Sequence, residues 1–150
     1  MKKFSIILVL FLNFAYGLDK NDPYFSDTNS TCPIKFIDVF KSPNFVAVIE
    51  YKDNKKILFS SSKQMFHYFY KLNRHFVPIN KLLVTDFKTG ELIEASEAFY
   101  VFGSRIVSAS GDDLIPFALE ADAKEFASKN SGHAILPFSK ITAKLIDYLN

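Results

Sequence analysis

The sequence predicts an α+β domain that consists of two consecutive strand-strand-helix-strand units. Two observations support this fold class. Segments rich in β-branched and aromatic residues are bounded by turn residues, and each pair of such segments is followed by apolar residues at helical spacing. The same order recurs in the second half of the chain with different residues, which indicates a structural duplication.

The first unit is expected to contain a strand over 44–51, a strand over 55–60, a helix over 62–73 and a strand over 81–87. Lys52-Asp53-Asn54 has turn chemistry between the first two strands, which predicts a hairpin. Ser61 and Gln64, three positions apart, resemble a capping box at the start of the helix. Lys88-Thr89-Gly90 is expected to form the turn after the last strand.

The second unit is expected to contain strands over 98–103 and 114–118, a helix over 121–129 and a strand over 134–138. Gly132 lies just after the helical pattern, where a glycine commonly ends a helix. A short final helix over 140–149 is expected to close the chain.

The N-terminus has the three regions of a secretory signal peptide. Lys2 and Lys3 precede an apolar run from Phe4 to Phe14, and Ala15-Tyr16-Gly17 has the small-x-small pattern of a cleavage site. The run is shorter than the roughly 20 apolar residues that span a bilayer. We therefore expect residues 1–17 to be a cleavable signal peptide that ends at Gly17, and the periplasm to be the destination. No cysteine follows the cleavage point to take a lipid, so no stable membrane anchor is expected.

The composition fits one folded domain, expected over 32–150. Hydrophobic residues make up 49% of the chain and include 17 Phe, which is ample for a core. The 18 basic residues nearly balance the 16 acidic ones. This balance gives no reason to expect nucleic acid or an acidic membrane as a partner.

Residues 18–31 are poor in aliphatic side chains and are expected to form a flexible polar leader. Within this segment, Asn29 begins an N-x-[ST] acceptor, and Asp27 lies two residues before it. This arrangement resembles the extended sequon of some bacterial oligosaccharyltransferases. Asn29 is therefore a candidate glycosylation site; the alternative is a chance match in a polar linker.

Cys32 is the only cysteine in the chain, so no internal disulfide is possible. In an oxidising compartment an unpaired thiol is open to intermolecular oxidation, to other reactions or to metal binding. Cys32 is therefore the most informative single residue in the sequence.

Ordered motifs in both halves of the chain resemble a known family. They include Pro43-Asn44-Phe45-Val46-Ala47 before the hairpin, Lys63-Gln64-Met65-Phe66 in the first helix, and Val84-Thr85-Asp86-Phe87-Lys88-Thr89-Gly90-Glu91 with Ala98-Phe99-Tyr100-Val101 in the second half. Over residues 32–139 this set is similar to the NosL family of nitrous oxide reductase accessory proteins. The resemblance implies an exported protein that binds copper(I) and supplies copper for the multicopper sulfide cluster of nitrous oxide reductase. It also implies the duplicated fold predicted above.

The metal motif of that family is kept only in part. Family members typically open with Cys-Pro-x-Cys-Gly-Met, whereas this chain reads Cys32-Pro33-Ile34-Lys35-Phe36-Ile37. Lys35 and Ile37 thus replace the second Cys and the Met. A family Met that precedes a Gly in the second half corresponds to Ser110 before Gly111. The resemblance therefore implies a copper site with fewer sulfur ligands.

Three residues are candidate copper(I) ligands, because this soft ion takes thiolate, thioether and imidazole donors. Cys32 lies at a family ligand position; the alternative is a thiol that binds nothing. Met65 belongs to the apolar stripe of the first helix, where a thioether also serves to fill the core. His133 follows Gly132 at a helix-to-strand junction, where its imidazole could face the mouth between the two halves or simply be solvated.

Two hypotheses about function follow. The first is a periplasmic copper(I) chaperone, with a copper-accepting protein such as nitrous oxide reductase as its partner and a site that a homodimer would complete. The second is an interaction module that has lost the metal and docks on a partner protein, with Phe66, Tyr68 and Tyr70 as exposed aromatic candidates. No phosphate loop, G-x-S-x-G motif or paired zinc spacing is present, so no enzymatic activity is expected.

Overall fold

The structure is a computed structural model that describes residues 17–73 and 76–150. The expected signal peptide, residues 1–17, lies outside these residues except for Gly17, so its cleavage stays a prediction. None of the helices in the described ranges is long and apolar enough to cross a membrane.

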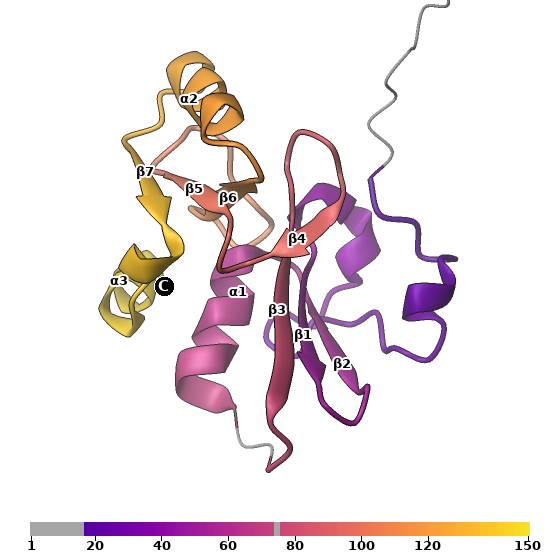
Figure 1. The fold of residues 1–150 in the computed structure, drawn as a ribbon. Coiled ribbons are helices and arrows are strands. Elements are labelled where there is room, and N and C mark those ends of the chain that lie inside the picture. The colour runs from indigo at the N-terminus through magenta and orange to yellow at the C-terminus, as the bar shows by residue number, and fades with distance from the viewer. Residues whose placement is uncertain (1–16, 74–75) are drawn as a thin grey trace, which may run out of the picture.

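The described chain forms two antiparallel sheets, and each sheet is made by one half of the sequence (Figure 1). The first sheet has the order β2-β1-β3-β4 and contains β1 (Ala47–Tyr51), β2 (Lys56–Phe59), β3 (Ile79–Thr85) and β4 (Leu92–Glu94). The second has the order β6-β5-β7 and contains β5 (Phe99–Phe102), β6 (Leu114–Phe117) and β7 (Ala134–Pro137). The predicted α+β class and its duplicated unit are confirmed; β4 is an addition that the sequence pattern did not predict.

Strands β1 and β3 of the first sheet and β5 of the second each pair with a neighbour on both sides. In the first sheet Ile49 of β1 lies opposite Ile57 of β2 and Leu82 of β3. In the second sheet Val101 of β5 lies opposite Ile115 of β6 and Ile135 of β7. Ala47, Val48, Ile49 and Tyr51 of β1 and Tyr100 and Val101 of β5 are buried, which fits the β-branched and aromatic composition of both strands.

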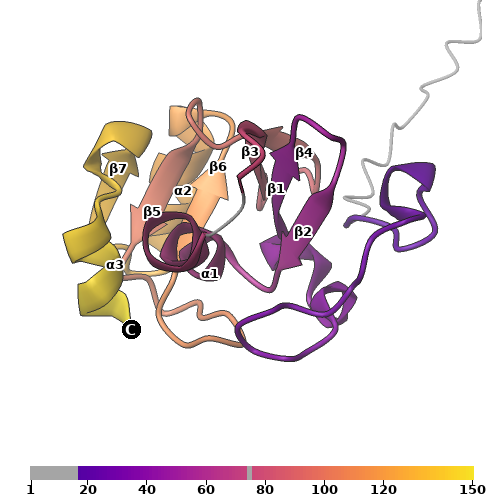
Figure 2. The same cartoon turned by 90° about the horizontal axis from the view of Figure 1, so that it is seen from below.

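Helix α1 (Ser62–His67) lies between the two sheets when the molecule is viewed from below (Figure 2). Ser61 caps its N-terminus by accepting a hydrogen bond from the Gln64 backbone N–H at 3.3 Å, which is one half of the predicted capping box. The Gln64 side chain makes no hydrogen bond back to Ser61, so the other half is not formed. The helix continues as a π-helical turn, η4 (Tyr68–Leu72). Ser62 to Phe66 are all buried, because α1 contacts β1 and β2 on one side and β6 on the other.

The second half contains α2 (Glu120–Lys129) and α3 (Ala143–Leu149). The first of these helices ends just before Gly132, as expected, and the Gly132 N–H donates to the Ala127 carbonyl at 2.8 Å. The left-handed residue at this helix end is Ser131, with a φ of 57°, and not the glycine. The final helix begins later than predicted, because Thr142 caps it through the Leu145 N–H and a 3-10 turn, η5 (Phe138–Lys140), precedes it.

The segment 18–31 packs against the first half instead of lying apart from it. Its 3-10 turn η1 (Pro23–Phe25) buries Phe25, whose ring meets Phe40 edge-on at 5.2 Å. The Tyr24 hydroxyl donates to the Glu50 carboxylate at 3.0 Å. The expectation of a flexible leader rested on the scarcity of aliphatic residues and overlooked this aromatic pair. The domain boundary at 31/32 stays a prediction.

Candidate metal centre

Residues 32–37 form a closed loop that begins at the single cysteine. The Cys32 N–H donates to the Ile37 carbonyl at 2.9 Å, and the Phe36 N–H donates to the Cys32 carbonyl at 2.9 Å. Thr31 and Asp38 form a β-bridge just outside these bonds. The loop is therefore held at its neck on both sides of Cys32.

Phe36 gives this loop an unusual backbone. Its φ is 56°, in the left-handed region, and its side chain is 80% exposed. In the motif that the sequence resembles, this position is a glycine, which takes such a φ without steric cost. The loop thus has the backbone that a glycine would favour, although a bulky residue occupies the position.

The Cys32 thiol is buried against the end of β2. It has no exposed surface, and the Ser60 hydroxyl donates a hydrogen bond to its sulfur at 3.5 Å. The cysteine is free, as a chain with one cysteine requires. A ligand would reach this sulfur only after the 32–37 loop moves away from Ser60.

Met65 and His133 lie in different parts of the molecule. Met65 is on α1, fully buried, and belongs to the same hydrophobic core cluster as Cys32. His133 is exposed just before β7, with its ring edge-on to Phe102 at 6.0 Å, and it lines a surface hollow with Asp112 and Tyr148. Neither Cys32 nor Met65 lines that hollow. The structure therefore brings His133 toward the C-terminal helix and not toward the cysteine loop.

Within residues 17–73 and 76–150, no group of three or more His, Cys, Asp or Glu side chains is placed to share a metal ion. A complete hard-metal or zinc cage is thus not preformed in the described chain. Copper(I) needs fewer ligands than these metals, because it accepts as few as two soft donors.

A buried carboxylate that sequence patterns did not reveal, Asp113, lies next to the start of α1. The Asp113 carboxylate accepts hydrogen bonds from the backbone N–H groups of Lys63 and Leu114, each at 2.9 Å, and from the Ser108 hydroxyl at 2.6 Å. Burial raises the pKa of Asp113, and these hydrogen bonds oppose the shift. In the sequence, Asp112-Asp113 is typical of a turn. No local pattern predicts that Asp113 accepts a hydrogen bond from a residue 50 positions away.

The Lys63 side chain connects the 108–113 loop to the C-terminal helix α3 by hydrogen bonds. Its ammonium donates to the Ser110 carbonyl at 2.7 Å and to the Leu149 carbonyl at 3.1 Å. Burial lowers the pKa of Lys63; Asp113 opposes this shift, and Lys35 adds to it.

A profile of the family described as NosL matches residues 23–146 of this chain. The chain belongs to the NosL family. Among curated proteins, the copper-binding lipoprotein NosL of Stutzerimonas stutzeri is 40% identical over 57 residues. That match covers 38% of this chain, and the chain spans only 30% of the length of the curated relative.

Two solved NosL structures resemble this chain. The crystal structure of the copper chaperone NosL from Shewanella denitrificans has a TM-score of 0.67 and 20% identity, and the match covers 79% of this chain and 93% of that chain. The solution structure of apo-NosL from Achromobacter cycloclastes has a TM-score of 0.49 and 24% identity over 67% and 87% of the two chains. The first similarity shows that this chain has the NosL fold.

Ser110, at the position where the NosL resemblance places a methionine, does not restore the missing sulfur. Its hydroxyl oxygen is buried and has no hydrogen-bond partner in the described part of the chain. The side-chain amide of Gln64, one residue after Lys63, is buried and unpartnered there as well. Oxygen donors suit copper(I) poorly, so Ser110 is a weak substitute for a thioether.

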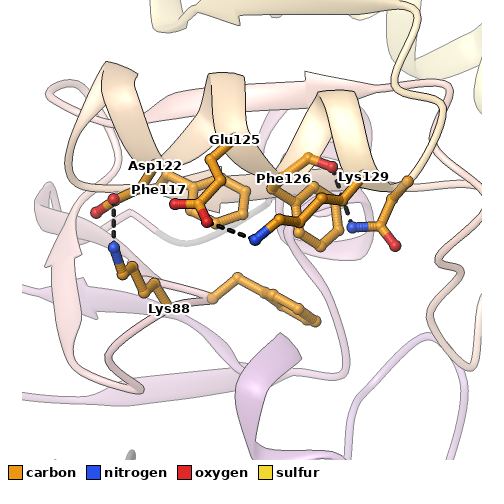
Figure 3. A pocket seen from close by; sticks show the side chains of 8 residues that line it. Lys88, Phe117, Asp122, Glu125, Phe126 and Lys129 are labelled. Atoms are coloured by element: carbon orange, nitrogen blue, oxygen red, sulfur yellow. Dashed lines mark hydrogen bonds and ion pairs between the residues drawn. The ribbon is translucent and has the colours of Figure 1, made fainter.

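A separate aromatic hollow lies between α2 and the turn after β3 (Figure 3). Phe87, Phe117 and Phe126 line it, and the ion pairs Lys88–Asp122 and Lys129–Glu125 run along its edge. Its volume is about 190 Å³. None of the candidate copper ligands lines this hollow, so it plays no part in the candidate metal centre.

Proposed function

We propose that this NosL-family protein is a periplasmic copper(I)-binding accessory protein, a chaperone that carries copper as cargo with Cys32 as its primary ligand. The observation that carries the proposal is the placement of Cys32: a free thiol at the start of a closed loop, at the position of the first family cysteine. The names of the relatives, a copper-binding lipoprotein and a copper chaperone, support copper as the cargo.

The second donor is proposed to come from Met65 or from a second molecule. Met65 shares the core cluster of Cys32, and a thioether matches the softness of copper(I). His133 lies beside Asp112 and Tyr148, so it fits better as a ligand on the surface of the C-terminal half. In a homodimer, two Cys32 thiolates would complete a two-coordinate site.

Binding requires the Cys32 loop to open. The sulfur is fully buried and accepts a hydrogen bond from Ser60, so the metal has to displace this contact. The loop is suited to such a movement because strain at Phe36 lowers its stability. A closed loop would protect the thiol from oxidation between loading and delivery.

Nitrous oxide reductase is the acceptor that the family resemblance suggests, and the role is one of delivery without catalysis. An acceptor would complete the transfer by offering more or softer ligands than the few that this chain supplies. A site with little sulfur favours release of copper, which suits a donor protein more than a storage protein.

A metal-free interaction module is the second candidate. It is favoured by Lys35, Ile37 and Ser110, which occupy positions where the family resemblance has sulfur. Of the aromatic residues expected to form its docking surface, Phe66 is fully buried, so that expectation is wrong for Phe66. Tyr68 is half-buried and packs against Phe59, whereas Tyr70 is 37% exposed and its hydroxyl donates to the Ile141 carbonyl.

An anaerobic titration decides between the two candidates. The mature chain, residues 18–150, competes for copper(I) with a chromophoric chelator, alongside the variants Cys32→Ser, Met65→Leu and His133→Asn. We expect one copper per chain or per dimer, and at least a hundredfold loss of affinity in Cys32→Ser, because the only thiolate is removed. Met65→Leu keeps the core volume and is expected to weaken binding about tenfold if the thioether is a ligand.

The same samples test the imidazole ligand and the oligomeric state. Equal affinity in wild type and His133→Asn would exclude the imidazole as a ligand, and sedimentation with and without copper would show whether the metal joins two chains. Undetectable binding in the folded wild type, or equal binding in Cys32→Ser, would contradict the copper proposal and leave the interaction module.

A further inference from the structure

The sequence contains one complete acceptor motif for N-glycosylation, and the copper proposal makes no use of it. Among all asparagines of the chain, only Asn29 is followed two positions later by Ser or Thr. Thr31 supplies the hydroxyl, Ser30 is not a proline, and Asp27 lies two residues before the asparagine. A carboxylate at that place belongs to the extended, acidic sequon that some bacterial oligosaccharyltransferases use.

The structure places this motif where an enzyme could reach it. Asp27, Asn29 and Thr31 are all exposed, and they lie between the packed turn η1 and the Thr31–Asp38 bridge. The segment is thus displayed on the surface and anchored at both ends. Exposed chain of this kind, with few backbone hydrogen bonds of its own, adapts to a binding cleft at low cost.

The side-chain amide of Asn29 is arranged suitably for the reaction. Its Oδ1 accepts a hydrogen bond from the Thr31 backbone N–H at 2.9 Å. In the described part of the chain, its Nδ2 donates no hydrogen bond, so the reacting nitrogen is unoccupied. A donor on Oδ1 also stabilises the negative charge that develops on the carboxamide when Nδ2 loses a proton.

We propose that Asn29 is an N-glycosylation site, modified after export by an oligosaccharyltransferase of the acidic-sequon class. The donor is an oligosaccharide linked to a lipid diphosphate. A bond forms between Asn29 Nδ2 and the anomeric carbon, the bond between that carbon and the phosphate oxygen breaks, the lipid diphosphate leaves, and the Nδ2 proton passes to a base of the enzyme. The proposal depends on export of the chain and is independent of copper binding.

The test uses the full chain with its own leader and a C-terminal tag that contains an Asp-x-Asn-x-Thr sequon. It is produced in a bacterial host together with an acidic-sequon oligosaccharyltransferase and its lipid-linked donor. Intact-mass spectrometry is then applied to the molecules that carry the tag glycan, because that glycan proves that both export and the enzyme worked in those molecules.

We expect these molecules to carry a second glycan in the wild type, and the corresponding mass increment to be lost in Asn29→Gln and in Asp27→Ala. Ser26→Ala, a neighbouring change outside the motif, should keep both glycans. Tag-glycosylated wild-type chains that carry a single glycan would overturn the proposal. A second glycan that persists in Asn29→Gln would overturn it as well.

Discussion

Phe36 is the residue at which sequence and backbone disagree most clearly. Its φ of 56° strains a side chain that has a Cβ, and its ring is 80% exposed, so little burial offsets the strain. Phe36→Gly should therefore raise the free energy of unfolding by about 0.5–1 kcal/mol, the relief of strain less the entropy that glycine adds to the unfolded chain. Urea denaturation followed by circular dichroism measures this gain.

Lys35→Gly is the matched control for this prediction. Lys35 is the neighbour of Phe36 in the same exposed loop, but its φ is not positive. Glycine at this position increases the entropy of the unfolded chain and relieves no strain. The free energy of unfolding is therefore expected to fall by about 0.5–1 kcal/mol. Equal effects of the two substitutions would show that the left-handed backbone of Phe36 is not a source of strain.

At the scale of elements, the N-terminus of α1 depends on a carboxylate from the other half of the chain. Asp113 accepts the Lys63 N–H, one of the backbone donors that a helix leaves unpaired at its start. Ser61 accepts the Gln64 N–H from within the first half. Both halves of the chain thus cap this helix. A substitution of Asp113 should therefore change the free energy of unfolding of the whole chain.

Titration of Asp113 predicts a specific pH dependence. Because burial raises the folded-state pKa of Asp113 above its ordinary value of 3.8, the folded chain holds this proton more tightly than the unfolded chain. The stabilising contribution is complete below 3.8 and is lost as the pH rises through the folded-state pKa. Asp113→Asn removes this titration, so the stability difference between the variant and the wild type should shift in favour of the variant as the pH rises from about 3.5 to 7.

Urea midpoints at a series of pH values measure that difference. Asp112→Asn serves as the control, because it removes one carboxylate at the adjacent exposed position and so matches the change in net charge. A difference between Asp113→Asn and wild type that stays constant with pH would contradict a raised pKa for Asp113.

At the scale of the whole molecule, the fold was largely predictable because its signals are local. The hairpin of β1 and β2, the Ser61 cap and the Gly132 helix end follow from alternation, capping and turn chemistry over a few residues. Strand β4 escaped prediction because three residues, Leu92–Glu94, are too few to show a period. Phe66 was expected to be exposed, but both sheets contact α1, so burial extends around the helix to polar residues such as Lys63 and Gln64.

Of the candidate site, the sequence predicted one proposed ligand, Cys32, but not its surroundings. Cys32 follows from the cysteine count and the family motif, whereas its burial beneath Ser60 depends on contacts 28 residues apart. The hydrogen bond from the Lys63 backbone N–H to Asp113 likewise joins residues 50 positions apart, and no period or spacing in the sequence predicts it. Local patterns therefore locate candidate ligands, and tertiary contacts decide how accessible those ligands are.

The position of α1 between the sheets predicts that both halves unfold together. Phe66 of α1 packs edge-on against Tyr100 of β5 at 5.7 Å and also contacts Phe138, so its removal opens a cavity at the junction. Phe66→Ala should lower the free energy of unfolding by about 3–5 kcal/mol, whereas Phe76→Ala, at a fully exposed position, should change it by about 0.5 kcal/mol or less.

The chain has no Trp, so tyrosine fluorescence reports tertiary packing and circular dichroism reports secondary structure. Because both sheets share α1, the two signals should change at one urea midpoint in the wild type and shift by the same amount in Phe66→Ala; separate midpoints would show that the halves unfold independently.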